Sequence, residues 1–180
     1  MLSRIDAGLV LSVSATTRGP RPSETEGLDY FFVDEDEFDR MIADGELLEW
    51  AEVFNAHRYG TPSAPVREHL QAGRDVILEI DVEGARQIRE QAPDAVMILL
   101  APPSMAELER RLRSRGTESD DSIAERLAKA QWELAQRGLF DHEVVNDDLE
   151  HASSQVAAII EASRVRSPDA SDQPTEDPSE

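Results

Sequence analysis

Residues 12–22 of this chain read Ser-Val-Ser-Ala-Thr-Thr-Arg-Gly-Pro-Arg-Pro, and residues 27–33 read Gly-Leu-Asp-Tyr-Phe-Phe-Val. Arg18 and Arg21 lie three residues apart on a turn stiffened by glycine and prolines, which lowers the entropy cost of presenting two guanidinium groups to one anion. Arginine makes planar, two-pronged contacts with phosphate that lysine cannot make. The stretch therefore predicts a phosphate-binding turn at the end of a β-strand, followed by an aromatic strand.

The composition narrows the possible classes of protein. The 180 residues suit one domain, and the absence of cysteine excludes disulfides and thiolate metal sites. The net charge of -20 opposes a broad nucleic-acid surface, because phosphate backbones need a contiguous basic face. No apolar run is long enough to cross a bilayer. We expect a soluble, cytoplasmic protein with no nucleic-acid or membrane partner and an unknown oligomeric state.

Apolar runs alternate with helical patterns along the chain. Residues 9–13, 75–81 and 95–100 are short apolar runs that suit buried strands, and a further strand is expected over residues 142–146. Asp34 and Glu37 form a capping-box signature for a helix that ends at Gly45. Strands that alternate with helices indicate an α/β fold with a mostly parallel sheet flanked by helices. Further helices are expected over residues 62–73, 84–91, 104–115, 119–136 and 149–162.

Two tyrosines and two carboxylates stand near the predicted turn or at strand positions. Tyr30 and Tyr59 are the only tyrosines, and a phenol can donate a hydrogen bond to the same phosphate as the arginines. Without them, a surface turn with unrelated arginines would be the better reading. Glu49 lies within a strand, and Asp81 ends an apolar one. From spacing alone, Glu49 suits a solvent-facing position and Asp81 a strand-end cap.

The order of these motifs resembles the guanylate kinases, from the GMP-binding segment to about residue 160. The resemblance implies a P-loop kinase type of fold over residues 1–162, with a small mixed α/β GMP-binding lobe over 14–64 and a helical lid region over 104–126. It also implies ATP-dependent, Mg²⁺-assisted phosphorylation of GMP to GDP, a step of purine nucleotide metabolism. Residues 163–180 form an acidic, proline-rich tail that is expected to be disordered.

The resemblance also implies roles for individual residues. It implies that the phosphate of GMP is bound by Arg18, Arg21, Tyr30 and Tyr59. It implies that the guanine is bound by Ser14, Glu49, Thr61 and Asp81. The lid cations that close over the ATP phosphates are Arg111, Arg115 and Arg126, and Asn146 lies near the adenine.

Three of these assignments leave alternatives open. Asp81 suits guanine recognition or the organisation of Mg²⁺ through its hydration shell. The lid arginines also suit a salt-bridged pair of surface helices with Glu107, Glu109 and Glu125. Glu83 stands where the family usually carries glutamine, which adds negative charge near the phosphates. The four histidines show no metal-ligand spacing, so no resident metal site is predicted.

The 180 residues show no recognisable motif for binding the phosphates of the donor, ATP. They contain no G-x-x-x-x-G-K-[ST] motif, and Lys129 is the only lysine. We expect the chain as printed to be inactive and the central first strand to be missing, so that strands 75–81 and 95–100 are not hydrogen-bonded neighbours. A non-catalytic module that binds GMP or a phosphorylated peptide is the alternative. A truncated start of a normal enzyme is the reading that the motifs favour.

Overall fold

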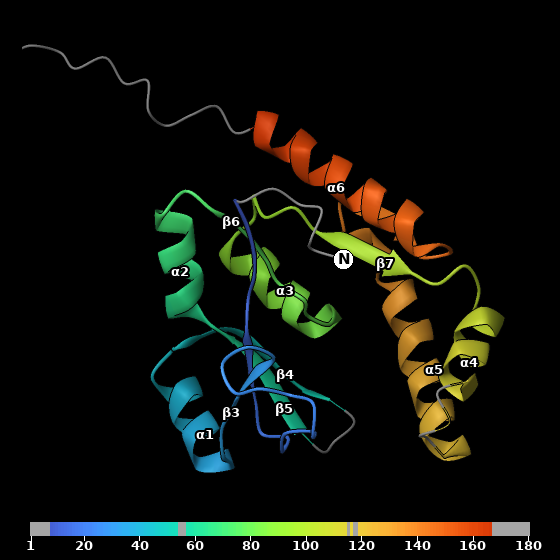
Figure 1. Cartoon of the computed structure of the whole chain (residues 1–180), viewed down its shortest axis with the longest axis horizontal. Helices are drawn as coiled ribbons and strands as arrows, with labels where there is room; N and C mark the ends of the chain where they lie inside the picture. Colours follow the sequence, from blue (N-terminus) through green and yellow to red (C-terminus); the bar gives the residue numbers. More distant parts are fainter. Residues whose placement is uncertain (1–7, 54–56, 115, 117–118, 167–180) are drawn as a thin grey trace, which may run out of the picture.

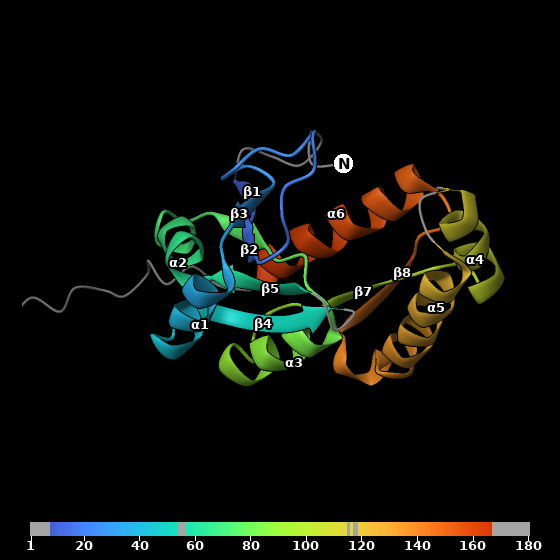
Figure 2. The same cartoon turned by 90° about the horizontal axis from the view of Figure 1, so that it is seen from below.

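The computed structural model describes residues 8–53, 57–114, 116 and 119–166, and it confirms an α/β fold. A small lobe with helix α1 lies at one end of the molecule and the helices α4 and α5 at the other, with α3 between them (Figures 1 and 2). The elements are β1 (Leu9–Leu11), β2 (Ser14–Thr16), β3 (Tyr30–Phe32), α1 (Glu35–Ala43), β4 (Leu47–Val53), β5 (His57–Pro62), α2 (Ser63–Gln71), β6 (Asp75–Ile77), α3 (Val82–Gln91), β7 (Ile98–Ala101), α4 (Met105–Ser114), α5 (Asp120–Ala135), a 3-10 turn (Arg137–Leu139), β8 (His142–Val145) and α6 (Leu149–Arg166).

The small lobe is built on one four-stranded sheet in the order β3-β2-β5-β4. β2 runs parallel to β3 and antiparallel to β5, and β4 pairs antiparallel with β5. Helix α1 covers this sheet through a core that contains Ala15, Phe38 and Met41. The Asp34 side chain caps α1 by accepting a hydrogen bond from the Glu37 N–H at 2.8 Å, as its sequence pattern predicts.

Helix α3 packs against β4, the edge strand of this sheet. The Gln87 side chain accepts from the Trp50 N–H at 3.1 Å and donates to the Trp50 carbonyl at 2.7 Å. Gln91 donates to the Leu48 carbonyl at 2.7 Å. Glutamine side chains thus supply hydrogen bonds that a further strand would otherwise provide, and they fix α3 beside the strand that carries Glu49.

The remaining described strands form two separate parallel pairs. β1 pairs with β6, and β7 pairs with β8. No ladder joins β6 to β7 within the described residues, as the sequence predicts for these two segments. The parallel layer is therefore divided at the place where the family resemblance puts a central strand.

Both of these strands differ in length from the prediction. β6 ends at Ile77 rather than at residue 81, because its partner β1 ends at Leu11 and the last bond of this pair runs from the Ser12 N–H to the Ile77 carbonyl. β7 begins at Ile98 rather than at residue 95, because Ala95 still belongs to a turn that its N–H closes on the Ala92 carbonyl.

Helix α6 is longer than the sequence pattern predicts. It continues to Arg166, so residues 163–166 are helical rather than part of the expected tail. Arg164 anchors this extension through a hydrogen bond from its Nε to Asp75 Oδ2 at 2.5 Å. Residues 167–180 lie outside the described ranges. Among the described helices, none combines the length and the apolar character needed to cross a membrane.

Candidate functional site

The predicted phosphate-binding turn brings an arginine against two aromatic rings. Arg18 follows β2, and its Nε donates to the Tyr59 hydroxyl on β5 at 3.1 Å. Its guanidinium carbon lies 5.3 Å from the centre of the Tyr30 ring, and the two tyrosine rings meet edge-on with centroids 5.9 Å apart. These contacts form because Thr16 lies opposite Tyr59 in the ladder, next to Phe32 of β3. The structure thus brings together three of the four residues expected at a phosphate.

A carboxylate that the sequence analysis missed completes this cluster. Glu24 Oε1 and Oε2 accept from Arg18 Nη2 and Nη1 at 2.9 and 3.0 Å, and Oε2 also accepts from the Arg21 N–H at 2.8 Å. The hydrogen bond from Arg18 holds the pKa of the Glu24 carboxyl below its usual range, and the same bond raises the pKa of Arg18. The spacing of Glu24, three residues after Arg21 on one turn, is the signal that could have revealed it.

Arg21, the fourth expected phosphate residue, lies at the rim of this cluster. Its side chain is 69% exposed, and its Nη1 lies 3.7 Å from Glu24 Oε1. Exposure leaves this guanidinium hydrated and able to reorient, whereas the Arg18 side chain is only 13% exposed. The cluster therefore contains one arginine held in place and one that extends into solvent.

A buried carboxylate lies on the neighbouring strand. Glu49 on β4 is 5% exposed and accepts from the Thr61 hydroxyl at 2.6 Å, because the hairpin register sets these two residues opposite each other. Its Oε2 lies against Gly84 of α3, where an added Cβ would come within 2.3 Å of it, so only glycine allows this approach. Burial raises the pKa of Glu49, and the charge of Asp81 adds to the shift. Glu49 is thus not the solvent-facing residue that spacing alone favours.

Asp81 lies beside this carboxylate at the start of α3. Its Oδ1 accepts from the Gly84 N–H at 3.0 Å and so caps α3, whereas spacing alone favours a cap at the end of a strand; β6 already ends at Ile77. Its Oδ2 accepts from Lys129 Nζ at 2.9 Å, a partner that sequence reasoning did not assign. Ser14 opens β2 opposite Tyr30 in the ladder, within the same lobe as Glu49.

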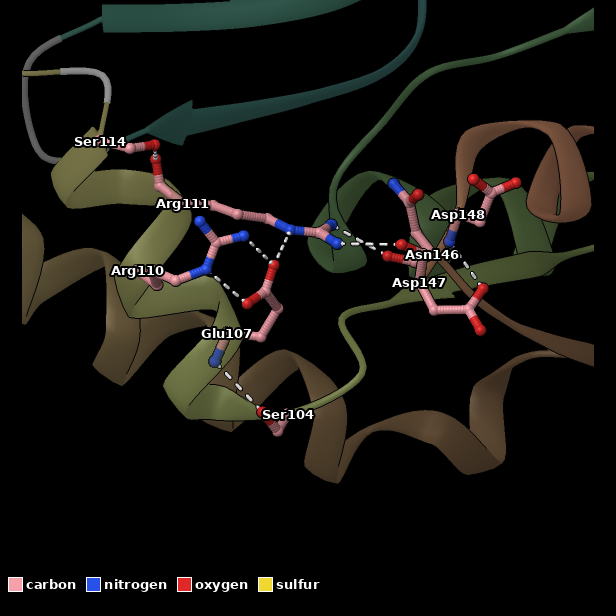
Figure 3. A network of polar contacts seen from close by, with 8 residues as sticks. All are labelled: Ser104, Glu107, Arg110, Arg111, Ser114, Asn146, Asp147 and Asp148. Atoms are coloured by element: carbon pink, nitrogen blue, oxygen red, sulfur yellow. Dashed lines mark hydrogen bonds and ion pairs between the residues drawn. The ribbon is translucent and has the colours of Figure 1, made fainter.

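Arg111, one of the three arginines expected in a lid, lies next to Asn146, the residue expected at the adenine. Its Nη1 and Nη2 donate to the carbonyls of Asn146 and Asp147 at 2.9 and 3.3 Å, and its Nε donates to Glu107 at 2.8 Å (Figure 3). Glu107 also accepts two hydrogen bonds from Arg110, and these arginines lower the pKa of Glu107 to about 2. Arg111 therefore ties α4 to the loop between β8 and α6.

Of the other two arginines expected in the lid, the structure describes only Arg126. Arg126 on α5 lines a cavity of about 220 Å³ between α4 and α5, together with Leu108, Leu112, Lys129, Ala130 and Glu133. Arg115 lies outside the described residues. Arg113 pairs with Glu109 on its own helix α4 and with Asp120 of α5, so a salt bridge does join the two helices, but through residues other than the lid arginines for which this alternative was open.

Comparison with known proteins decides the family. A family model described as guanylate kinase matches residues 1–163. A guanylate kinase of Synechococcus sp. (strain CC9902) is 59% identical over 146 residues, which cover 81% of this chain and 78% of that relative. The chain belongs to the guanylate kinase family.

Further similarities agree with this family, whose members are ATP:GMP phosphotransferases. A guanylate kinase of Sphingopyxis alaskensis is 50% identical over 167 residues, which cover 92% of this chain and 76% of that relative. The crystal structure of guanylate kinase from Anaplasma phagocytophilum matches with a TM-score of 0.73 at 36% identity, over 86% of this chain and 76% of that one. The P-loop kinase type of fold expected from the sequence is therefore confirmed.

Within this guanylate kinase fold, the expected site residues that the structure describes lie at the Arg18 cluster, the Glu49–Asp81 pair, the Arg111–Asn146 contact and, for Arg126, the cavity between α4 and α5. The described residues contain no group of three or more histidine or acidic side chains arranged to hold a metal ion.

Proposed function

We propose that this chain recognises GMP as the acceptor of the guanylate kinase reaction, in which ATP phosphorylates GMP to GDP, and that turnover requires a glycine-rich loop and lysine that the 180 residues do not contain. The observation that carries the proposal is the buried Glu49, held by Thr61 and lying beside Asp81 in the lobe that also holds the Arg18 cluster. Burial of a carboxylate costs free energy unless a ligand or a partner in the protein forms hydrogen bonds with it, and a bound guanine would provide such hydrogen bonds. Membership of the guanylate kinase family supports the same activity.

Guanine recognition rests on paired acceptors at the base end. Guanine presents an N1 hydrogen and a 2-amino group on one edge, and adenine lacks that pair of donors. Glu49 and Asp81 accept these hydrogens, while Ser14 and Thr61 complete the base site with their hydroxyl groups. Because the wrong base would leave buried acceptors unpaired, such a site discriminates strongly.

The phosphate of GMP binds to Arg18, Arg21, Tyr30 and Tyr59. Four of the five donors of the Arg18 guanidinium already serve Tyr59, Gly19 and Glu24. Phosphate binding therefore requires Glu24 to share or yield its place on Arg18. The exposed Arg21 is the group that can turn toward the incoming phosphate at little cost.

Phosphoryl transfer needs positioning and charge stabilisation rather than a protein base, because the attacking GMP oxygen is already anionic. This oxygen forms a bond to the γ-phosphorus as the bond to the departing ADP oxygen breaks. Arg111, Arg115 and Arg126 stabilise the charge on the phosphoryl group, and Asn146 contacts the adenine. Mg²⁺ arrives as part of the ATP complex. Asp81 serves guanine rather than Mg²⁺, because the Lys129 ammonium 2.9 Å from its Oδ2 would repel a divalent cation, whereas each carboxylate oxygen keeps a second lone pair for a base hydrogen.

Calorimetric titration of the 180-residue chain with GMP and with AMP tests the recognition step. We expect GMP to bind at least about 100-fold more tightly, given the discrimination that obligatory hydrogen bonds provide. Equal affinity for the two nucleotides would contradict the guanine assignment. A phosphoserine peptide that binds as tightly as GMP would instead favour a non-catalytic binding module.

A further inference from the structure

The only lysine of the chain lies on helix α5, and its side chain contacts Asp81 at the base end of the proposed GMP site. Lys129 on α5 places its Nζ 2.9 Å from Asp81 Oδ2 and 3.7 Å from Glu133 Oε1, one turn further along the helix. The side chains of Lys129 and Asp81 are 27% and 19% exposed. A pair so largely shielded from water interacts more strongly than a surface ion pair does.

Asp81 connects the Lys129 ammonium to Glu49, the other carboxylate proposed to bind guanine, through a chain of contacts. One of its oxygens faces Lys129, and the other caps α3 at the Gly84 N–H. Gly84 in turn lies directly against Glu49, too close for any larger side chain. The orientation of the Asp81 carboxylate thus sets where the first turn of α3 lies relative to Glu49.

The charges around Asp81 show why a cation is needed there. Burial raises the pKa of both Glu49 and Glu133, and the negative charge of Asp81 adds to each shift. Lys129 opposes the shift at Glu133. Without the ammonium, Asp81 would face two neighbouring carboxylates, and mutual repulsion would favour rotating it away from the cap.

We propose that Lys129 is a positioning residue for GMP recognition: it holds the Asp81 carboxylate in the guanine-reading orientation and links helix α5 to the base site. The inference rests on the proposed function, in which Glu49 and Asp81 bind guanine. A compact ammonium can reach Asp81 and Glu133 from one position on α5. A guanidinium at residue 129 keeps the charge but is larger and planar.

Calorimetry on the full 180-residue chain tests the inference with three variants. Lys129→Met should weaken GMP binding at least about tenfold, the typical effect of losing a hydrogen bond to a charged group, while AMP binding changes little. Lys129→Arg should restore most of the GMP affinity. Arg137→Met is the matched control, because it removes one positive charge from a 63% exposed side chain that lies 3.8 Å from Glu143. It should leave GMP binding within about twofold of the parent chain.

A second measurement does not depend on whether Lys129→Met folds. Hydrogen exchange on the unmodified chain should show that GMP slows exchange of the α5 amides around residues 126–133 more than exchange in α6. Equal exchange in α5 with and without GMP would overturn the inference. So would a folded Lys129→Met variant with the parent GMP-to-AMP affinity ratio. Failure of the unmodified chain to prefer GMP over AMP would instead contradict the proposed function.

Discussion

The small lobe and the parallel strands of the core meet their backbone hydrogen-bonding needs to very different degrees. In the lobe, β2 and β5 have neighbours on both sides, and glutamines of α3 bond to the outer strand β4. In the core, β6 and β7 each have one neighbour within the described residues. Apolar side chains around the core strands remain exposed, including Leu100 at 51% and Val145 at 41%.

This difference separates the two halves of the proposed reaction. The lobe that would bind GMP closes its sheet with segments from residues 14–62, so its geometry depends on local pairing. The donor half would need a glycine-rich loop and a lysine that the 180 residues do not contain. GMP binding and turnover should therefore respond independently to changes in the two regions.

The largest effect should come from adding the donor segment. We expect the 180-residue chain to form GDP at least about 1,000-fold more slowly than a chimera with the first strand, phosphate loop and half-helix of a related guanylate kinase, because loss of one transition-state cation costs that much. A coupled assay for GDP measures both rates. GMP affinity should be alike in the two proteins. Rapid GDP formation by the unextended chain would show that the donor site has been misplaced.

The next effect concerns the buried carboxylate of the lobe. Glu49→Gln replaces one acceptor with a donor and should weaken GMP binding about 10- to 100-fold, as expected for a hydrogen bond to a charged group. AMP binding should stay unchanged. Glu52→Gln, three residues along the same strand and exposed, is the matched control and should bind GMP like the parent chain. Calorimetry with both nucleotides gives these affinities, and an unaffected GMP affinity in Glu49→Gln would remove Glu49 from the base site.

The pH dependence of the same residue should separate stability from binding. Burial raises the pKa of folded Glu49 above the ordinary value of 4.5, so the folded state holds the proton more tightly than the unfolded state does. The contribution of Glu49 to the free energy of unfolding should therefore rise as the pH falls through the folded pKa toward 4.5. GMP affinity should fall over the same range, by about tenfold per pH unit once Glu49 is protonated in the free protein.

The phosphate of GMP also titrates near neutral pH and would change GMP affinity in any variant. Comparison with Glu49→Gln removes this contribution and leaves the two trends that belong to Glu49. In the parent chain, relative to the variant, stability should increase and GMP affinity should decrease as the pH is lowered. Urea unfolding and calorimetry at matched pH values provide the two curves. Parallel rather than opposite changes would mean that the ionised carboxylate is not the form that binds GMP.

Local features of the fold were predictable, and long-range contacts were not. The cap of α1 follows from Asp34 and Glu37 alone, because both groups lie within one turn. The Glu49–Thr61 pair depends on the register of a hairpin whose ladder shifts between Leu47 and Glu49, and spacing cannot reveal such a shift. Family resemblance assigned both residues to the base site, but it did not predict the hydrogen bond between them.

Contacts to partners outside the family motifs escaped prediction altogether. Glu24 and Lys129 were not assigned, because carboxylates and ammonium groups on exposed patterns usually belong to solvated faces. Arg111 was assigned to the ATP phosphates, yet it also donates to two backbone carbonyls, and carbonyls leave no trace in a sequence. The lengths of β6 and β7 were overestimated because an apolar run reports burial and not the presence of a pairing partner.

The smallest effect should come from the ion pairs of α4, and it tests whether α4 and the lobe are separate. Glu107 is stabilised as an anion by Arg110 and Arg111, which lower its pKa to about 2 from an ordinary 4.5. Because the folded pKa is depressed, its contribution to stability is present above pH 4.5 and is lost as the pH falls toward 2. Glu107→Gln should lower Tm near neutral pH by no more than about 2 °C, since the pairs are solvent-exposed.

The matched variant is Glu109→Gln, which breaks the ion pair with Arg113 on the same helix and leaves Arg111 untouched. Both variants should melt within about 2 °C of the parent chain, the range of exposed ion pairs, and the Glu107→Gln difference should disappear in acid. GMP affinity should be unchanged in both, because these contacts lie on α4 and the loop after β8 rather than in the four-stranded lobe. A loss of GMP affinity in Glu107→Gln as large as that in Glu49→Gln would mean that α4 shapes the GMP site even without ATP, and the independence of α4 and the lobe would then fail.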